Sequence, residues 1–156
     1  MNLPKVNLPV DRNKLKDTVF RVTTGLHREL YRRTGGKLGG KAGKMQMMLL
    51  TTTGRSSGQP RTTPLNCISD GDRFLAVASY GGDDRDPQWF KNLQAKPDAT
   101  IQVGADTIPV RASVASPEER TELWPKVVAA YKGYDSYQRR TERSIPVVIL
   151  TRQAGA

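Results

Sequence analysis

The hydrophobic and polar positions of this chain follow two periods, and the change between them falls near residue 45. Before it, apolar residues recur every three or four positions, which predicts an amphipathic helix over residues 14–33. The apolar stripe of this helix consists of Leu15, Val19, Val22, Leu26 and Leu30. The basic residues along its flank are Lys14, Arg21, Arg28 and Arg32. The stripe indicates either packing against the helix's own domain or contact with an anionic membrane surface.

The segment that follows, "TGGKLGGKAGK" (34–44), is rich in glycine and is expected to be a link without an element of its own. From Met47 onward, apolar and β-branched residues alternate with polar ones, which predicts short strands. Asp70-Gly71 marks a hairpin turn, and Pro109 indicates an edge position. The expected strands cover residues 47–53, 60–69, 73–79, 98–103, 107–114 and 145–150.

Two helices are expected among these strands. Pro87 begins one over residues 87–95. Ser116 and Glu119 form a capping-box pattern at the start of the other, over residues 117–131. Strands joined mostly by hairpins predict an α+β fold, mainly antiparallel β, with a barrel and helices on its outside and ends. A parallel nucleotide-binding sheet is excluded, because strand–helix alternation and a G-x-G-x-x-G motif are both missing.

Length and charge divide the chain. Its 156 residues fit one core, no apolar run is long enough to cross a membrane, and the N-terminus lacks a signal-peptide core, so a cytoplasmic protein is expected. Residues 1–44 hold 11 of the 25 Lys and Arg residues but only 3 of the 15 Asp and Glu residues. We therefore expect a basic helix and link over 1–44 and a barrel over 45–156. Such a basic arm could meet nucleic acid, anionic lipid or no partner.

The single cysteine and single histidine limit the chemistry. Cys67 alone cannot form an internal disulfide or a cysteine-cluster zinc site, and His27 alone argues against a histidine-based metal site or a Ser-His-Asp triad. No metal is expected. Cys67 lies in an expected strand, where a small buried residue and a reactive thiol are the two alternatives.

The stretch "LLTTTGRSSGQPRTTPLN" (49–66) carries the densest set of hydrogen-bond donors. Gly54 and Gly58 allow a bend in which backbone N–H groups could form an anion-binding nest, and Arg55 and Arg61 add cationic forks. A solvated hairpin loop is the alternative.

Two further segments carry candidate chemistry. In "VASYGGDDRDPQWFKN", small residues end a strand, and Trp89 and Asn92 share a helical face that suits a flat ring, although a core tryptophan is the alternative. Tyr131, Tyr134 and Tyr137 lie three apart and could form an aromatic wall around a planar substrate, or a tyrosine-rich packed surface.

Three segments in order, "LLTTTGRSSGQPRTTPL", "ASYGGDDRDPQWFKNLQAKPDATIQV" and "YKGYDSYQRRTERSIPVVIL", together resemble the deazaflavin-dependent nitroreductase family over about residues 34–150. The resemblance implies a split β-barrel of the FMN-binding type. It also implies reduced coenzyme F-420, an 8-hydroxy-5-deazaflavin with a phosphodiester and a polyglutamate tail. The implied activity is hydride transfer from this cofactor to quinones and nitroaromatic compounds.

The resemblance implies roles for individual residues. The residues that would hold the phosphate and acidic tail are Arg55, Ser56, Ser57 and Arg61. The residues that would surround the deazaflavin are Thr62, Thr63, Pro64, Leu65, Asn66, Val77, Ala78, Ser79, Tyr80, Gln88, Trp89, Phe90, Lys91, Asn92 and Tyr134. The residues that would line the acceptor pocket are Tyr131, Tyr134 and Tyr137.

The chain also departs from the family pattern. Many relatives carry lysine where this chain has Ser56 and Tyr80, and an aromatic residue where it has Asn66. Arg139 and Arg140 add positive charge near the implied pocket mouth.

The acceptor gains negative charge as hydride arrives, so a proton donor is expected. Tyr134 is the first candidate and Ser79 the second, and solvent is the alternative. Two rival functions are an FMN-dependent reductase on the same barrel and a basic module that binds lipid or nucleic acid. For the oxidoreductase itself, no nucleic-acid partner is expected. The helix over 14–33 would bring the enzyme to the inner face of the cell membrane.

Overall fold

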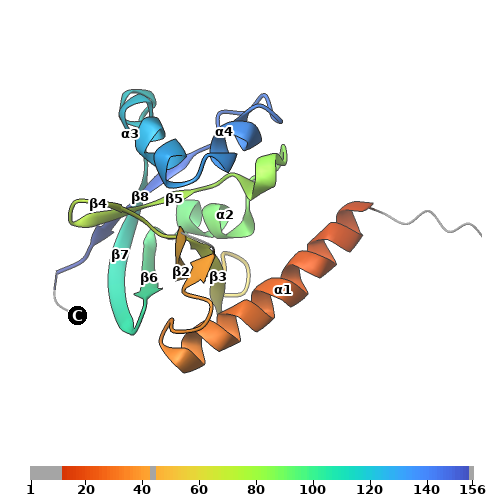
Figure 1. The fold of residues 1–156 in the computed structure, drawn as a ribbon, viewed down its shortest axis with the longest axis vertical. Coiled ribbons are helices and arrows are strands. Elements are labelled where there is room, and N and C mark those ends of the chain that lie inside the picture. The colour runs from red at the N-terminus through yellow and green to blue at the C-terminus, as the bar shows by residue number, and fades with distance from the viewer. Residues whose placement is uncertain (1–11, 43–44, 155–156) are drawn as a thin grey trace, which may run out of the picture.

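The structure, a computed structural model, describes residues 12–42 and 45–154 (Figure 1). Residues 1–11, 43–44 and 155–156 lie outside this description, and with them most of the segment in which no signal peptide was expected. The helices are α1 (Arg12–Thr34), η1 (Tyr80–Gly82, a 3-10 turn), α2 (Gln88–Ala95), α3 (Pro117–Ala130) and α4 (Gly133–Gln138). The strands are β1 (Lys41–Ala42), β2 (Met45–Thr53), β3 (Pro60–Asn66), β4 (Ile68–Asp70), β5 (Arg73–Val77), β6 (Asp98–Val103), β7 (Asp106–Val114) and β8 (Val147–Arg152).

The strands form one curled antiparallel sheet. Its order is β3-β2-β6-β7-β8-β5-β4, with β1 added at the start of β2. Strands β3 and β4 stand at opposite ends of this order, yet only Cys67 separates them in the sequence, so the chain bends there and the sheet curls into a split barrel. The predicted α+β barrel is confirmed. Two details differ, because the expected strand 60–69 divides at Cys67 and the glycine-rich link contains β1.

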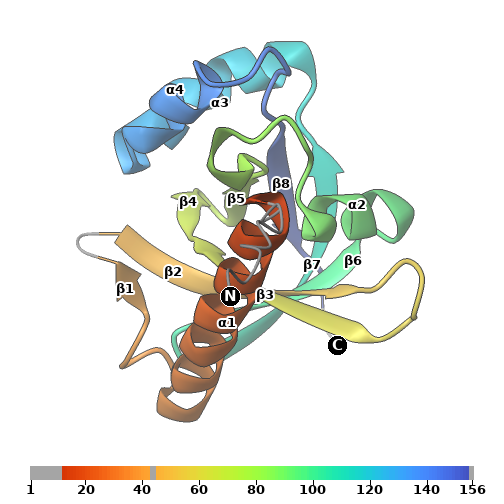
Figure 2. The ribbon, with the colours of Figure 1, turned by 90° about the vertical axis from the view of Figure 1, so that its right-hand side faces the viewer.

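Apolar residues pack on both faces of this sheet. The cluster inside the barrel contains Met48, Leu50, Phe74, Ala76, Ala78, Ile101, Val110, Val148 and Leu150, with Trp89, Phe90 and Leu93 added by α2. A second cluster, beneath α3 and α4, contains Ile68, Leu75, Val77, Leu123, Val127, Tyr134, Ile145, Val147 and Ile149. Strands β5 and β8 contribute to both clusters, which explains why "RFLAV" and "IPVVIL" are nearly continuous apolar runs. In Figure 2, α3 and α4 lie together above the barrel and α1 lies apart from them.

The C-terminal half of α1 is anchored to the barrel by Tyr31. This side chain is fully buried, and its hydroxyl donates to the Met47 carbonyl oxygen at 3.0 Å and accepts from the Gly104 N–H at 2.8 Å. Gly36, at φ +79°, allows the close approach, because a Cβ there would lie 2.8 Å from the Gly104 Cα. The stripe pattern gave no sign of Tyr31 as the anchor.

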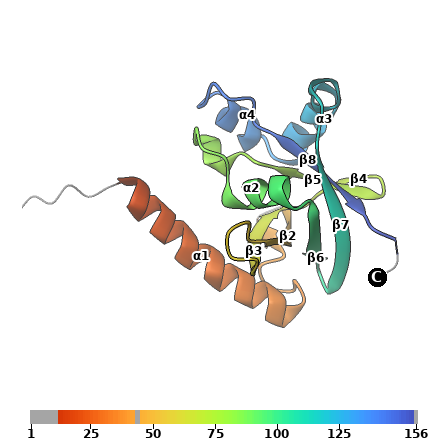
Figure 3. The ribbon, with the colours of Figure 1, turned by 180° about the vertical axis from the view of Figure 1, so that it is seen from behind.

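Four of the five residues in the apolar stripe of α1 face solvent. Val22 and Leu26 are 68% and 67% exposed, and Val19 and Leu30 are also exposed. The expectation that the stripe packs against its own domain is therefore wrong, because the face that carries Tyr31 makes that contact. Figure 3 shows α1 extending away from the barrel, next to β3. Within the described residues, no helix combines the length and the apolar character that a membrane span requires.

Local signals in the barrel half were mostly accurate. Ser116 accepts from the Glu119 N–H at 3.1 Å, and the Glu119 carboxylate accepts from the Ser116 N–H, so the capping box is confirmed.

The predicted edge position of Pro109 is wrong, because β7 lies between β6 and β8. Pro109 is paired with Thr100 on β6, but the pairing of β7 with β8 begins only at the next residue, where Val110 is opposite Arg152. The missing N–H of Pro109 is therefore tolerated, because no β8 residue lies opposite it.

Candidate cofactor and acceptor site

The loop expected to bind an anion joins β2 to β3 as a tight hairpin. The Gly54 N–H donates to the Gln59 carbonyl oxygen at 2.8 Å, and the Gly58 N–H donates to the Gly54 carbonyl oxygen at 2.8 Å. Gly58 has φ +68°, a backbone conformation that residues with a Cβ rarely adopt. The N–H groups of these two glycines are therefore used inside the hairpin, and an anion-binding nest made by the other N–H groups of the loop stays a prediction. The positive charge of the loop comes from its side chains.

Arg55 is exposed but held in place by α2. Its Nη1 donates to Asn92 Oδ1 at 3.0 Å, its Nη2 donates to Gln88 Oε1 at 2.7 Å, and its backbone N–H reaches the same Asn92 oxygen at 3.2 Å. Asn92 is itself buried and donates from Nδ2 to buried Thr52 Oγ1 at 3.1 Å. This chain of bonds connects the hairpin loop to the barrel core, so the Arg55 guanidinium has a defined position at the surface.

The other shoulder of the loop is held less firmly. Among residues 12–42 and 45–154, the Arg61 guanidinium donates a hydrogen bond to Ser57 Oγ alone, at 3.4 Å. Next to it, Thr62 Oγ1 lies 2.8 Å from Thr51 Oγ1 and accepts from Arg32 Nη2 at 2.8 Å. Arg32 belongs to α1, so this helix brings a further cationic side chain to β3. The sequence marked Arg32 as part of a basic flank and gave no sign of this contact.

The backbone of the loop after β5 is organised by Arg143, a residue that the sequence analysis missed. Arg143 donates to the carbonyl oxygens of Ala78 and Ser79 at 3.0 Å and to that of Asp83 at 2.9 Å, and it pairs with Asp86 at 3.1 Å. Its side chain is 18% exposed. One arginine shortly before an apolar strand is a weak signal, because nothing local indicates its distant carbonyl partners.

Tyr80 connects this loop to α1. It has φ +46°, and its hydroxyl donates to Asp17 Oδ1 at 2.8 Å. Arg85 lies 3.5 Å from the other Asp17 oxygen and 5.3 Å from the centre of the Tyr80 ring. The Tyr80 hydrogen bond is the main cause that lowers the pKa of Asp17. Tyr80 is therefore an attachment point for α1.

The three tyrosines expected to line the acceptor pocket do lie together. The rings of Tyr131 and Tyr134 are 5.3 Å apart and nearly perpendicular, and Tyr137 lies about equally close to both, at 6.0 and 6.1 Å. Tyr134 is 5% exposed, and its burial raises the pKa of the phenol to about 12. Its hydroxyl accepts from Asn66 Nδ2 at 2.6 Å, which brings the end of β3 against α4.

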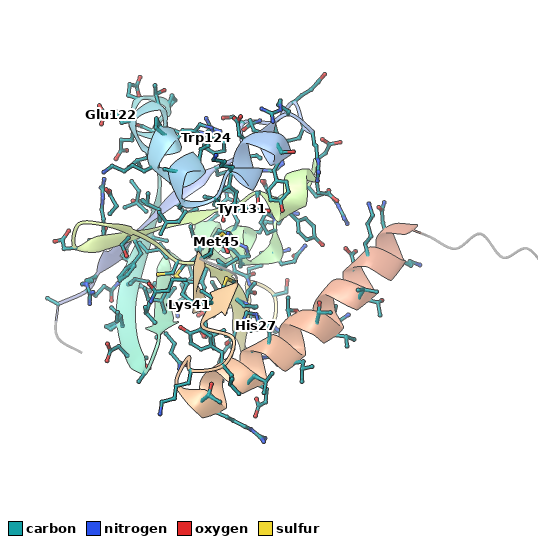
Figure 4. The ribbon with its side chains drawn as sticks, in the orientation of Figure 1. His27, Lys41, Met45, Glu122, Trp124 and Tyr131 are labelled. Carbon is teal, nitrogen blue, oxygen red and sulfur yellow. The ribbon has the colours of Figure 1, made fainter. Side chains whose placement is uncertain are left out.

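A cavity of about 180 Å³ adjoins this cluster. Its lining residues are Met45, Gln46, Asn66, Cys67, Ile68, Ala130 and Tyr131. Figure 4 shows Tyr131 and Met45 facing the same region from the helical layer and from the start of β2. Cys67 is half-buried, and burial raises the pKa of its thiol to about 11, which favours the small, unreactive residue over the reactive thiol.

The expected site residues on α2 and at the end of β5 differ in whether they pack in the core or contact the Arg55 loop. Trp89 and Phe90 are 6% and 3% exposed and pack in the barrel core, which supports a role in holding α2 over direct contact with a ring. Gln88 and Asn92 are the residues of α2 that reach the Arg55 loop. Ser79 is buried, and its carbonyl oxygen is fixed by Arg143.

A split barrel with an arginine-bearing hairpin, a helix that orients one arginine, and an adjacent aromatic cluster could hold a flat cofactor that carries an anionic group. The model of the F420H(2)-dependent quinone reductase family matches residues 23–152. An F420H(2)-dependent quinone reductase of Mycobacterium tuberculosis is 45% identical over 132 residues, which cover 82% of this chain and 89% of that protein. A putative F420H(2)-dependent quinone reductase, also of Mycobacterium tuberculosis, is 48% identical over 103 residues, which cover 66% of this chain and 87% of that protein.

Two solved structures are also similar to this chain. An F420-H2 dependent reductase is 39% identical with a TM-score of 0.63, and the match covers 67% of this chain and 92% of that one. A structure described as a domain-swapped dimer is 33% identical with a TM-score of 0.66, covering 86% and 98%.

The chain belongs to the F420H(2)-dependent quinone reductase family. It is therefore an oxidoreductase that uses coenzyme F-420, whose reduced form is written F420H(2), and transfers a hydride to a quinone. The expected family, fold and cofactor are confirmed.

Proposed function

We propose that the hairpin between β2 and β3 is the anion site for the phosphate and acidic tail of coenzyme F-420. The observation that carries this proposal is the fixed position of Arg55, which three hydrogen bonds to α2 hold in place. A cation that is already oriented loses little conformational freedom when an anion binds. Arg61 provides a second guanidinium on the opposite shoulder, and the exposed hydroxyls of Ser56 and Ser57 lie between them.

The deazaflavin ring then lies along β3, between residues 62–66 and the loop 77–80. Arg143 holds the carbonyl oxygens of Ala78 and Ser79 in place on this side of the proposed ring position. When bound, the cofactor supplies the hydride. The chain's own residues orient the reactants and provide the groups that meet the developing charge.

The acceptor is a planar quinone or nitroaromatic compound held against Tyr131, Tyr134 and Tyr137. Because the pKa of Tyr134 is raised to about 12, its phenol is protonated near neutral pH and is available as a donor. The cavity beside Asn66 and Tyr131 offers additional space at this end of the site. Ser79 remains the second candidate for a polar contact to the acceptor.

The exposed stripe of α1 is proposed to rest on an anionic membrane, where lipid-dissolved quinones occur. Val19, Val22, Leu26 and Leu30 provide the apolar face, and exposed Arg21 lies on the flank. An apolar stripe with a cationic flank suits an anionic bilayer surface, and a single helix of this kind binds it reversibly.

The cofactor and acceptor assignments are tested on the full-length protein. Titration with oxidised coenzyme F-420 measures cofactor affinity, and oxidation of the reduced form by menadione or by a nitroaromatic compound measures turnover. We expect Tyr134→Phe to lower kcat/KM for menadione and to leave cofactor affinity nearly unchanged. A variant that loses cofactor affinity but keeps its catalytic rate would place Tyr134 on the cofactor side. Turnover with menadione alone would remove nitroaromatic acceptors from the proposal.

Membrane docking is tested by sedimentation with vesicles that contain anionic lipid, at low and high salt. The double variant Val22→Ser, Leu26→Ser should reduce binding. Val114→Ser removes an exposed valine of β7 and serves as the matched control, because Val114 is 50% exposed and lies outside α1. Equal vesicle binding by the parent protein, the double variant and Val114→Ser would show that the stripe does not bind the membrane.

A further inference from the structure

The hydrogen bond between Asn66 and Tyr134 distinguishes one tyrosine of the cluster from the other two. Asn66 is the last residue of β3 and is half-buried, and its Nδ2 lies 2.6 Å from the Tyr134 hydroxyl oxygen. Tyr131 and Tyr137 have their hydroxyls 3.4 Å from each other. Within the described residues, Asn66 is the only hydrogen-bond partner recorded for the Tyr134 hydroxyl.

The direction of this bond matters for chemistry. An amide N–H can only donate, so the Tyr134 oxygen accepts and its own hydrogen remains available for another acceptor. If the residue at position 66 were an acceptor, Tyr134 would direct its hydrogen to it. The amide of Asn66 therefore sets Tyr134 as a donor toward whatever lies against the cluster.

We propose that Asn66 is a positioning residue that holds Tyr134 as the proton donor to the acceptor's oxygen. The proposal rests on the proposed function, in which the acceptor lies against the tyrosine cluster. A quinone takes up the hydride with its electron pair, and the cofactor is oxidised. The O–H bond of Tyr134 breaks as an O–H bond forms on the quinone oxygen, which completes the hydroquinone. The resulting tyrosinate regains its proton from water.

The same bond assists the proton transfer. A hydrogen bond to a charged oxygen is about twice as strong as one to a neutral oxygen, so the Asn66 amide stabilises the tyrosinate more than the phenol. This agrees with the lowering effect of Asn66 on the Tyr134 pKa, which opposes the larger effect of burial. Only an interaction that strengthens during the reaction increases the rate of the chemical step.

The test compares Asn66→Ala with Asn66→Asp in single-turnover reduction of menadione by the protein with reduced coenzyme F-420 bound. Asn66→Ala removes the donor, and we expect a loss of about tenfold in the rate. Asn66→Asp replaces the donor with an acceptor of nearly the same shape, and we expect a larger loss at neutral pH. As pH falls and the new carboxyl is protonated, it can donate again, so this variant should regain activity while Asn66→Ala should not.

Tyr134→Phe provides the matched background. If Asn66 acts through Tyr134, the rates of the two Asn66 variants should converge once Tyr134→Phe is also present. A second readout uses the cofactor-free protein, in which tyrosinate absorbance follows the ionisation of Tyr134, with Tyr134→Phe as the blank. Asn66→Asp should shift this ionisation to higher pH.

Three outcomes would overturn the inference. These are full activity in Asn66→Asp, losses that persist unchanged in the Tyr134→Phe background, and reduced cofactor affinity with an unchanged rate of the bound complex. A failure of the proposed function is recognised separately, because the parent protein would then fail to bind coenzyme F-420 or to reduce menadione.

Discussion

Replacement of Arg55 by alanine should weaken the binding of coenzyme F-420 without unfolding the protein. The side chain donates to Asn92 and Gln88 at 3.0 and 2.7 Å and is exposed beyond them. Loss of one charge-assisted hydrogen bond to the anionic tail corresponds to about 1.5–3 kcal/mol, or about 10- to 150-fold in Kd. Because Arg55 is exposed, we expect its loss to change the free energy of unfolding by less than about 1 kcal/mol.

Two further variants separate orientation from charge. Gln88→Ala removes one of the bonds that orient Arg55 and keeps the charge, so we expect a loss of about 0.5–1 kcal/mol, or about two- to fivefold in Kd. Arg111→Ala is the matched control, because Arg111 is an exposed arginine paired with Asp98 on the β6–β7 hairpin. Its Kd should remain near that of the parent.

Fluorescence titration of oxidised coenzyme F-420 at two salt concentrations measures these affinities, and the difference between Arg55→Ala and the parent should shrink at high salt. Thermal unfolding of each variant checks the fold. An Arg55→Ala protein that binds within about twofold of the parent would refute the reasoning, since that difference is under 0.5 kcal/mol.

Three other outcomes are expected. Burial raises the pKa of Tyr134 from 10.0 to about 12, so this phenol contributes its full stabilisation well below pH 10 and loses it, about 3 kcal/mol in all, as pH rises through 12. Tyr134→Phe should flatten that part of a plot of unfolding free energy against pH. Cys67, with a thiol pKa of about 11, should react more slowly with iodoacetamide at pH 8 in the folded than in the unfolded protein, and equal rates would contradict its burial. Ser56→Lys should tighten binding of long-tailed more than short-tailed cofactor, measured by the same titration, and an equal gain for both tails would place residue 56 away from the tail.

Much of the fold was determined by local sequence. Alternating apolar residues predicted the barrel strands, because one face of each strand must be buried, and Ser116 with Glu119 predicted the start of α3, because both partners of the capping box lie within one turn. The ordered motifs around Arg55, Ser79 and Tyr134 also identified the family, which the comparisons confirmed.

Other features were decided only by the tertiary structure. The contacts that fix Arg55 to Asn92, Tyr134 to Asn66 and Ser79 to Arg143 join residues 37, 68 and 64 positions apart. No periodicity indicates such pairs, because each depends on how the barrel closes and on which helix packs at its end.

The orientation of α1 was also decided only by the tertiary structure. Its stripe predicted an amphipathic helix correctly, but periodicity shows only that two faces differ, not which one meets the barrel. Tyr31 decides the orientation, because its buried hydroxyl finds backbone partners on two other segments of the chain, and the apolar stripe is consequently left at the surface.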